Sequence, residues 1–391
     1  MRIYIIAGEA SGDLHGSNLM RSIYAKCPEA EIRFWGGDEM NKVYQEHAKP
    51  CCGLVKDYKE GAVMGFIEIL GSIGKLLRNI KMCKADIEAF KPDTIVYIDY
   101  PGFNLRIAEW AHKKGYRNVY YIAPKVWASR EFRVRKLKKY IDRLIIIFPF
   151  EIDYFKSKGL KNVDYVGNPL MESIFDSLDR NMTRKSFLAK YNLEDSPIIA
   201  MLAGSRKGEI NTMMPQLVGF ASKLHTLERY KDYKFIIAGA PSRTEADYEA
   251  YITPEQKEYI KLIFGETRNI VRFADAAVVN SGTASLETAL LDTPQVVGYR
   301  VGSFLAYIIG ISIVTCKYIS LGNLCVNKYA FNEFLQYDCN PENLVREVRN
   351  LIENDMYRDM MKADYAQIRR LLEIGDNVPS SDKAADIVLN K

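Results

Sequence analysis

The chain has 391 residues, of which 48% are hydrophobic and 26% are charged. Single hydrophobic cores stop growing beyond about 250–300 residues, so the length predicts two domains, and the composition excludes a disordered or membrane-spanning chain. The 54 basic residues exceed the 49 acidic ones, which gives a formal charge of +5. This excess is too small to indicate nucleic-acid binding, but it suits phosphates or lipid headgroups as partners.

The seven cysteines and four histidines exclude two further classes of protein. No C-x-x-C pair is present, so the spacing supports neither a disulfide framework nor a zinc site, and it fits a reducing compartment. The N-terminus runs directly into an apolar stretch and has no cleavage site of an export signal. We therefore expect a cytoplasmic protein without a structural metal.

The first half of the chain alternates short apolar runs with helical periodicity, which is typical of a parallel sheet covered by helices. The expected strands are residues 2–7, 31–35, 94–98, 119–122, 143–147 and 163–166. Gly167-Asn168-Pro169 then interrupts the pattern, because the residue before a proline avoids the helical conformation. We expect a Rossmann-like domain over residues 1–167.

The same alternation restarts in the second half. The expected strands are residues 198–202, 234–238, 276–279 and 295–299, separated by helix-length segments such as 209–225. From Glu342 onward, apolar positions recur at helical spacing. We expect a second Rossmann-like domain over residues 168–365, and a helical tail over 366–391 that crosses back to the first domain.

Two segments are unusually apolar. Residues 64–83 place Met64, Phe66, Ile67 and Leu70 among apolar residues with lysines and arginines between them, so this face could lie on a membrane surface. A core-facing helix has the same pattern, and the pattern alone favours it. Residues 301–316 are uncharged but shorter than the roughly 20 residues that a membrane-spanning helix needs, so a buried or interfacial helix is expected.

The sequence GEASGD at residues 8–13 directly follows the first expected strand and precedes a helix expected from near residue 15. Open α/β sheets bind ligands at this edge. The G-x-G-x-x-G spacing is absent and Glu9 would repel a pyrophosphate, so Glu9 and Asp13, with Ser11 between them, suit sugar hydroxyls better. A strand-to-helix turn with Asp13 as the N-cap explains the sequence equally well.

Asp99 ends the strand expected at 94–98, at the same edge of the sheet as Glu9. A carboxylate there can act as a general base that removes a proton from an acceptor hydroxyl. An aspartate after a strand is also a common turn residue or helix cap, and the sequence alone does not separate these alternatives.

Two loops of the second domain suit a nucleotide diphosphate. Arg206 follows the strand at 198–202 on a glycine-containing loop, where it can hold a phosphate. The sequence SGTASLE at 281–287 offers hydroxyls, a glycine and a helix start, and Glu287 could hold ribose hydroxyls. The candidate UDP-binding residues of these loops are Gly204, Ser205, Arg206, Glu209, Ser281, Gly282, Thr283 and Glu287. A simple helix-capping sequence is the alternative for 281–287.

Trp127 and Arg130 lie in the sequence PKVWASR at 124–130, which follows another strand. An exposed tryptophan beside basic residues would stack on a sugar, and the basic residues would grip a phosphate. A buried tryptophan that anchors the loop is at least as common.

Several sequence blocks, in this order, together resemble the lipid-A-disaccharide synthase family over almost the whole chain. These blocks are AGEASGD at 7–13, MGF at 64–66, IDYPGFN at 98–104, PKVWASR at 124–130, FPFE at 148–151, VGNPL at 166–170, AGSRKGEI at 203–210, SGTASLE at 281–287, ISLGNL at 319–324 and EFLQ at 333–336. The resemblance implies an α/β protein of GT-B fold with UDP held mainly by the second domain and the reaction in the interdomain cleft.

The resemblance also implies the reaction. An inverting transferase would move 2,3-diacylglucosamine from UDP-2,3-diacylglucosamine to 2,3-diacylglucosamine 1-phosphate (lipid X), forming the β(1→6) disaccharide and UDP without a metal or other cofactor. Asp99 and Glu9 become the catalytic carboxylates, and Asn323 joins the UDP contacts. The protein would lie peripherally on the cytoplasmic face of the inner membrane, bind no nucleic acid and form a homodimer.

The chain departs from the family pattern at a few positions. Asn168 replaces a usual histidine and cannot act as a base near neutral pH, so we assign it no proton transfer. Ala203 and Gly322 replace prolines, and Asn327-Lys328 replaces a Gly-Arg pair. Two other functions compete: a UDP-sugar epimerase of the same fold, and a membrane-associated UDP-binding protein without activity.

Overall fold

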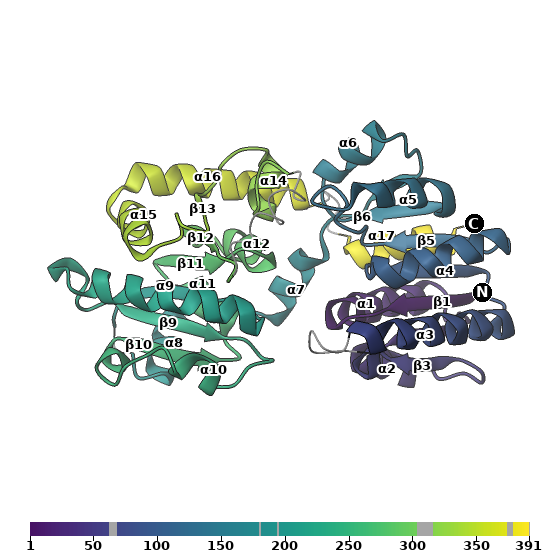
Figure 1. The fold of residues 1–391 in the computed structure, drawn as a ribbon, viewed down its shortest axis with the longest axis horizontal. Coiled ribbons are helices and arrows are strands. Elements are labelled where there is room, and N and C mark those ends of the chain that lie inside the picture. Colours follow the sequence, from purple (N-terminus) through teal and green to yellow (C-terminus); the bar gives the residue numbers. More distant parts are fainter. Residues whose placement is uncertain (62–68, 180, 194, 303–315, 374–377, 391) are drawn as a thin grey trace. The chain divides into compact units, whose positions relative to one another are not determined.

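The computed structural model describes residues 1–391 except 62–68, 180, 194, 303–315, 374–377 and 391. The chain divides into two compact units, of which unit 1 comprises Met1–Glu172 and Leu372–Lys391, and unit 2 comprises Ser173–Leu371. Each unit is a parallel sheet with helices packed on it (Figure 1). The expected pair of Rossmann-like domains is confirmed.

Unit 1 contains a seven-stranded sheet in the order β3-β2-β1-β4-β5-β6-β7. Its strands are β1 (Arg2–Ala7), β2 (Glu31–Gly36), β3 (Gly53–Asp57), β4 (Thr94–Ile98), β5 (Arg117–Tyr121), β6 (Arg143–Ile146) and β7 (Val163–Tyr165). Its helices are α1 (Ala10–Lys26), α2 (Asp38–Gln45), α3 (Ile69–Phe90), α4 (Pro101–Lys113), α5 (Val134–Tyr140), α6 (Phe150–Ser157) and α17 (Ser380–Leu389), with short 3₁₀ helices η1 (Tyr58–Gly61) and η3 (Glu131–Arg133). Helix α1 packs against α2 and α17, and α4 packs against α3 and α5.

Unit 2 contains a six-stranded sheet in the order β10-β9-β8-β11-β12-β13. Its strands are β8 (Ile198–Leu202), β9 (Lys234–Gly239), β10 (Ile260–Phe264), β11 (Ala276–Asn280), β12 (Gln295–Tyr299) and β13 (Glu333–Leu335). Its helices are α8 (Arg184–Lys190), α9 (Lys207–His225), α10 (Ala246–Glu249), α11 (Thr267–Phe273), α12 (Thr283–Leu290), α14 (Leu321–Val326), α15 (Pro341–Glu353) and α16 (Asp355–Leu372), with 3₁₀ helices η4 (Glu228–Tyr230) and η5 (Glu255–Glu258). Helix α7 (Pro169–Ser177) contains the division between the units.

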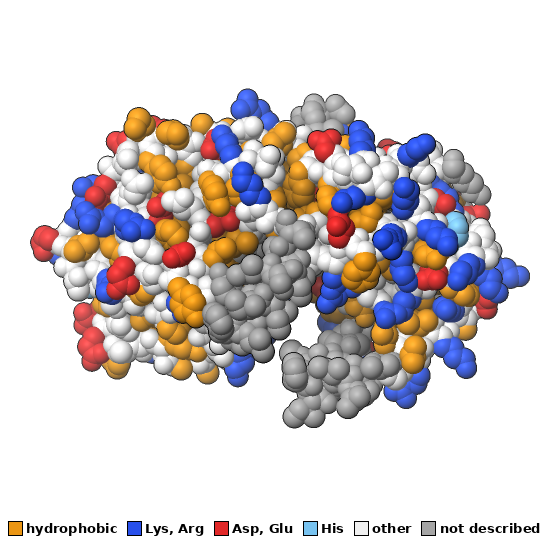
Figure 2. Space-filling view, turned by 45° about the horizontal axis from the view of Figure 1, so that its top comes forward, with side chains coloured by type: hydrophobic (Ala, Val, Ile, Leu, Met, Phe, Trp, Pro, Cys, Tyr) orange, Lys and Arg blue, Asp and Glu red, His pale blue; other side chains and the backbone are white. Residues whose placement is uncertain are grey.

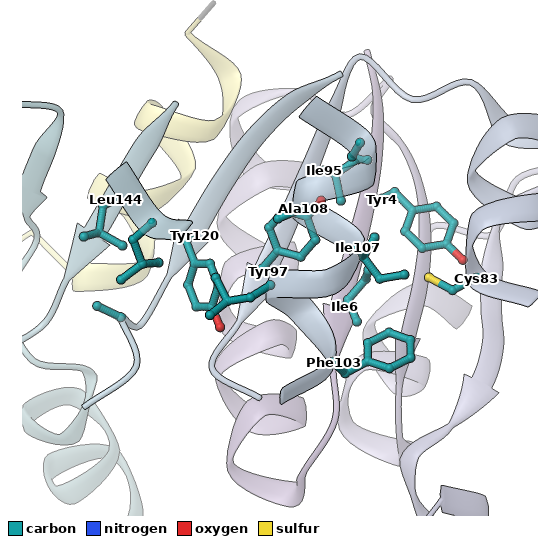
Figure 3. Close-up of a cluster of buried hydrophobic side chains, with 14 of the residues drawn as sticks. Tyr4, Ile6, Cys83, Ile95, Tyr97, Phe103, Ile107, Ala108, Tyr120 and Leu144 are labelled. Atoms are coloured by element: carbon teal, nitrogen blue, oxygen red, sulfur yellow. The ribbon is translucent and has the colours of Figure 1, made fainter. Parts of the chain in front are cut away.

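The core of unit 1 is rich in tyrosine. Tyr4, Tyr97 and Tyr120 are fully buried among aliphatic side chains (Figure 3). Buried hydroxyls need partners, and here Tyr4 donates to Asp86 at 2.7 Å and Tyr97 donates to Asn118 at 2.9 Å. The hydroxyl of Tyr120 donates to the main-chain oxygen of Asp99, so the core holds the candidate base directly.

The segment that follows unit 2 returns to unit 1. Helix α17 packs on α1 with Ala384, Ala385 and Val388 buried, and Lys26 forms an ion pair with Asp386 at 2.6 Å. The guanidinium of Arg117 donates to main-chain oxygens at the end of α17. Unit 1 is therefore built from two separated parts of the chain.

The two apolar segments of the sequence lie largely outside the described residues. Met64, Phe66 and Ile67, and residues 303–315, are among those not described, and Leu70 lies in α3. In the described part of α3, Cys83 and Ile87 are buried in the core, while Leu77 is 60% exposed. No helix among the described residues is both long and apolar enough to span a bilayer.

Candidate functional site

The turn between β1 and α1 places Glu9 at the carboxyl edge of the unit 1 sheet. The turn depends on Gly8, because a Cβ atom there would lie 2.3 Å from the ring of Tyr100. The side chain of Glu9 is exposed. Burial, together with the negative charge of Glu9, raises the pKa of Tyr100. Glu9 thus lies beside the turn that follows β4.

Asp99 occupies that turn in a strained conformation. Asp99 and Tyr100 both have left-handed backbone angles, with φ of 41° and 48°, which are rare for residues other than glycine. Asn104 donates to the main-chain oxygen of Asp99 at 2.8 Å, and Tyr120 donates to the same oxygen at 2.5 Å. These contacts fix the backbone and leave the half-buried carboxylate at the sheet edge.

The environment of Asp99 suits a base. Burial and the negative charge of Glu9 raise the pKa of the Asp99 carboxyl, while the positive charges of Lys125 and Arg133 oppose this rise. A carboxylate with a raised pKa accepts a proton more readily than an ordinary aspartate. The expected pairing of Asp99 with Glu9 at one edge is thus present in the structure.

A cavity of about 480 Å³ opens beside Glu9. Trp35, Tyr100 and Phe103 form an aromatic wall, and Lys56 and Asn79 add polar groups. A space of this size with mixed lining suits an amphipathic ligand.

Asp13 has a structural task that the sequence did not reveal. Helix α1 begins at Ala10, so Asp13 is not its N-cap and that alternative is wrong. Asp13 is buried, and its carboxylate accepts hydrogen bonds from the main-chain N–H groups of Gly37, Glu39 and Met40 at the start of α2. The Asp13 carboxylate is largely occupied by these three hydrogen bonds, so it has little capacity left to bind a sugar. Ser11, by contrast, is exposed on the first turn of α1.

Trp127 is buried, so the expectation of an exposed stacking surface is wrong and the anchoring alternative is confirmed. Its indole N–H donates to Glu151 at 2.9 Å, and its ring packs on Phe150. Glu151 also accepts from the main-chain N–H groups of Ile147 and Phe148, and burial raises its pKa to about 7. Arg130 of the same loop is exposed.

In unit 2, the loop after β8 is closed by Glu209. Gly204 has a φ of 99°, and Glu209 accepts from the main-chain N–H groups of Ser205 and Arg206 at 3.0 and 3.2 Å. Arg206 also pairs with Glu209 at 2.9 Å, yet its side chain remains 83% exposed. Glu209 therefore shapes the loop, and Arg206 is accessible to an anion.

The loop after β11 leads into α12 through Gly282 and Thr283, both exposed. The N-cap residue of α12 is Gly282, which has no side chain to cap the first turn, so the N–H groups of this turn suit a negatively charged ligand. Glu287, one turn later, forms an ion pair with Arg268 at 3.0 Å. Ser281 donates weakly to the main-chain oxygen of Ile319 at 3.5 Å.

Asn323 is fully buried, and its amide is occupied within unit 2. Its nitrogen donates to Phe331 and Glu333, and its oxygen accepts from the main-chain N–H groups of Ala330 and Phe331. Both polar atoms of the Asn323 side chain are therefore already hydrogen-bonded, and neither is free for the contact with UDP that the resemblance implies. Its observed contacts instead hold the segment that leads into β13.

Sequence reasoning missed several residues that shape these loops. Glu333 accepts from the main-chain N–H groups of Ile319 and Ser320, and Gln336 pairs with both main-chain groups of Val301. Glu333 and Gln336 belong to the EFLQ block, so the block itself was the available signal. Arg268 carried no such signal, because its partner Glu287 lies on another helix.

Asn168 is also explained by local contacts. It is buried, donates to Ile147 at 3.2 Å and accepts from the N–H of Leu170 at 3.0 Å. These contacts give Asn168 a structural role. Within the parts of the chain that the structure describes, no group of three acidic, histidine or cysteine side chains could hold a metal ion.

Comparison with solved structures identifies the fold. The structure resembles that of UDP-GlcNAc 2-epimerase from Neisseria meningitidis bound to UDP-GlcNAc, with a TM-score of 0.65, 13% identity and complete coverage of both chains. The fold is therefore GT-B, a fold of glycosyltransferases and related UDP-sugar enzymes.

The sequence comparisons are more specific. Residues 3–387 match the family described as lipid-A-disaccharide synthetase. Lipid-A-disaccharide synthase 1 of Legionella pneumophila (strain Lens) is 35% identical over 95% of this chain and 93% of its own length. The synthase of Geobacter metallireducens is 32% identical over 99% and 96%. The chain belongs to the lipid-A-disaccharide synthetase family, so the resemblance inferred from its motifs is confirmed.

Proposed function

We propose that this enzyme transfers 2,3-diacylglucosamine from UDP-2,3-diacylglucosamine to 2,3-diacylglucosamine 1-phosphate, with inversion, forming the β(1→6) lipid A disaccharide and UDP. Family membership gives the class of reaction. The observation that carries the catalytic part is the position of Asp99. It lies on a strained turn at the carboxyl edge of the unit 1 sheet, close enough to Glu9 for the charge of Glu9 to raise its pKa together with burial.

Asp99 is the proposed general base. The acceptor 6-hydroxyl is a weak nucleophile, so a carboxylate takes its proton as the oxygen attacks the anomeric carbon and the bond to UDP breaks. Burial and Glu9 raise the basicity of Asp99, and its backbone is fixed by Asn104 and Tyr120. Glu9 orients the acceptor from the neighbouring turn.

Unit 2 is proposed to bind UDP. The first turn of α12, which begins at a glycine cap, offers its N–H groups to the diphosphate, and exposed Arg206 balances the negative charge that grows on the leaving group. This scheme assigns the leaving-group charge to residues of the protein and requires no metal. Glu287, oriented by Arg268, is proposed to accept hydrogen bonds from the ribose.

The lipid substrates imply a place of action at a membrane. We propose that the enzyme lies peripherally on the cytoplasmic face of the inner membrane and that Met64, Phe66, Ile67 and Leu70 contact acyl chains. We also propose that the enzyme forms a homodimer.

The test is to incubate the purified protein with both lipid substrates in mixed micelles and to identify the product by mass. We expect the disaccharide 1-phosphate and stoichiometric UDP. A UDP-sugar epimerase would instead act on UDP-GlcNAc without an acceptor, and a binding protein would retain UDP affinity without any product; either result contradicts the proposal.

A further inference from the structure

Four basic residues gather beside Asp99. Arg106 lies on α4, Lys125 and Arg130 lie on the loop after β5, and Arg133 ends η3. The charges of Lys125 and Arg133 act on the Asp99 carboxylate, and those of Arg130 and Arg106 act on Arg133. We call these four residues the basic cluster. Figure 2 shows many lysines and arginines on one face of unit 1.

Asp99 is the acidic group that acts on the basic cluster, but it forms no ion pair with the cluster within the described residues. Across the ranges that the structure describes, none of its four side chains forms an ion pair, whereas the nearby Lys136 pairs with Glu109 at 2.8 Å. Arg133 is half-buried, and burial together with the like charges of its neighbours lowers its pKa. Cations that repel one another while partly desolvated are stabilised by a bound anion.

The backbone that carries the cluster is fixed. Ile122 and Arg130 have left-handed φ angles of 62° and 59°, and such a conformation is especially costly for a β-branched isoleucine. Between them, Trp127 is buried and bonded to Glu151. A rigid loop holds its basic side chains near one place, which lowers the entropic cost of binding.

The chemistry of the cluster matches a phosphate monoester. Such a group carries a charge of about −1.5 to −2 at neutral pH and three acceptor oxygens, and the guanidinium fork binds two of these at once. The diphosphate of the donor already has a candidate site in unit 2. The remaining phosphate of the proposed reaction belongs to the acceptor, whose hydroxyl must reach Asp99.

We propose that the basic cluster, with Arg133 at its centre, binds the phosphate of the acceptor sugar and so orients the acceptor for proton removal by Asp99. This inference rests on the proposed function. It makes Arg133 a determinant of acceptor specificity, and it predicts that the enzyme discriminates between an acceptor with the 1-phosphate and the same acceptor without it.

The kinetic experiment compares these two acceptors in mixed micelles for the wild type and for Arg133→Gln and Arg130→Gln. Arg135→Gln is the matched control, because Arg135 is exposed on α5 and lies outside the cluster. We expect the wild type to prefer the phosphorylated acceptor by about 10²-fold or more in kcat/KM, from at least two charge-assisted hydrogen bonds. Arg133→Gln should raise KM for that acceptor by about 10–100-fold and leave KM for the unphosphorylated acceptor unchanged. Because the charge of Arg133 also acts on Asp99, its loss should change kcat by the same factor for both acceptors.

Arg133→Lys separates the roles of charge and shape. It should restore part of the preference, because an ammonium supplies the charge without the fork. An equal rise in KM for both acceptors, or a preference that survives both glutamine variants, would overturn the proposal. Circular dichroism and thermal melting show whether each variant is folded. If Arg133→Gln does not fold, the same comparison of the two acceptors is made with Arg130→Gln.

A binding measurement distinguishes this inference from the proposed reaction. Calorimetry with glucosamine 1-phosphate, glucosamine and inorganic phosphate requires no turnover. We expect only glucosamine 1-phosphate to bind detectably, and Arg133→Gln to abolish its binding; inorganic phosphate binding equally well would overturn the assignment to the acceptor. If the wild type binds glucosamine 1-phosphate but forms no disaccharide, the proposed function fails while the phosphate site stands.

A second source of phosphate is an anionic lipid headgroup. Sedimentation with vesicles of phosphatidylglycerol and phosphatidylcholine, or of phosphatidylcholine alone, tests this source. We expect Arg133→Gln to sediment with the anionic vesicles like the wild type. A selective loss of anionic vesicle binding, with acceptor preference intact, would show that the cluster serves the membrane and would refute the proposal.

Discussion

Replacing Glu151 by glutamine should remove a strong dependence of the stability of unit 1 on pH. Glu151 is buried, and burial raises its pKa from 4.5 to about 7. The folded state therefore binds more protons than the unfolded state between these values. The stability that this carboxyl contributes is fully present below pH 4.5 and is lost as the pH rises through about 7.

The size of the effect follows from the two pKa values. Each unit of difference corresponds to about 1.4 kcal/mol, so the contribution of Glu151 should fall by about 2–3 kcal/mol between pH 5 and pH 8. Glutamine does not titrate, and its NH₂ group would face either the indole N–H of Trp127 or the main-chain donors. The variant should therefore lose at least one hydrogen bond, at a cost of about 1–3 kcal/mol, at every pH.

Urea unfolding at pH 5 and pH 8, followed by tryptophan fluorescence, measures the difference. Trp35, Trp110 and Trp127 all lie in unit 1, so the signal reports on that unit alone. The stability advantage of the wild type over Glu151→Gln should be larger at pH 5 by about 2–3 kcal/mol. The control is Glu29→Gln, whose side chain is 93% exposed. An advantage that does not change with pH would refute the reasoning.

Three further outcomes are expected. Asp99→Asn should lower kcat by about 10²–10⁴-fold, because the amide cannot take a proton, and UDP affinity measured by calorimetry should not change; near-normal activity with Glu9→Gln inactive would exchange the two roles. Activity should persist in EDTA, and a loss that magnesium or manganese restores would contradict the proposed stabilisation of UDP. Changing Phe66, Ile67 and Leu70 together to serine should reduce vesicle binding and raise KM for the lipid substrates without unfolding, whereas a core-facing helix would lose about 2–5 kcal/mol for each emptied position in a melting experiment.

The central strands could be predicted from the sequence because they are buried on both faces. β4 and β8 are entirely buried and appear as uninterrupted apolar runs. The edge strand β7 was expected at 163–166, but the edge strands β3, β10 and β13 could not be recognised in this way. β3 is half-exposed and contains Lys56 and Asp57, and β13 has only three residues, so neither has a distinctive pattern.

The site was predictable where it depends on the order of elements. Asp99 and Glu9 each follow a parallel strand, which places both at one edge of the sheet. The roles of Asp13 and Trp127 depended instead on contacts with distant residues. Asp13 caps α2, and Trp127 binds the carboxylate of Glu151, and both partners come from other parts of the chain. The spacing of residues along the sequence does not reveal such contacts.

The return of α17 to unit 1 also sets the order in which the molecule can fold. Unit 2 is continuous in sequence, so it can complete its core as soon as residue 371 has left the ribosome. Unit 1 must wait, because α1 keeps an uncovered face, and Arg117 lacks its main-chain acceptors, until α17 is made. During synthesis, the half that holds the candidate base thus remains open to chaperones and proteases longer than the half proposed to bind UDP.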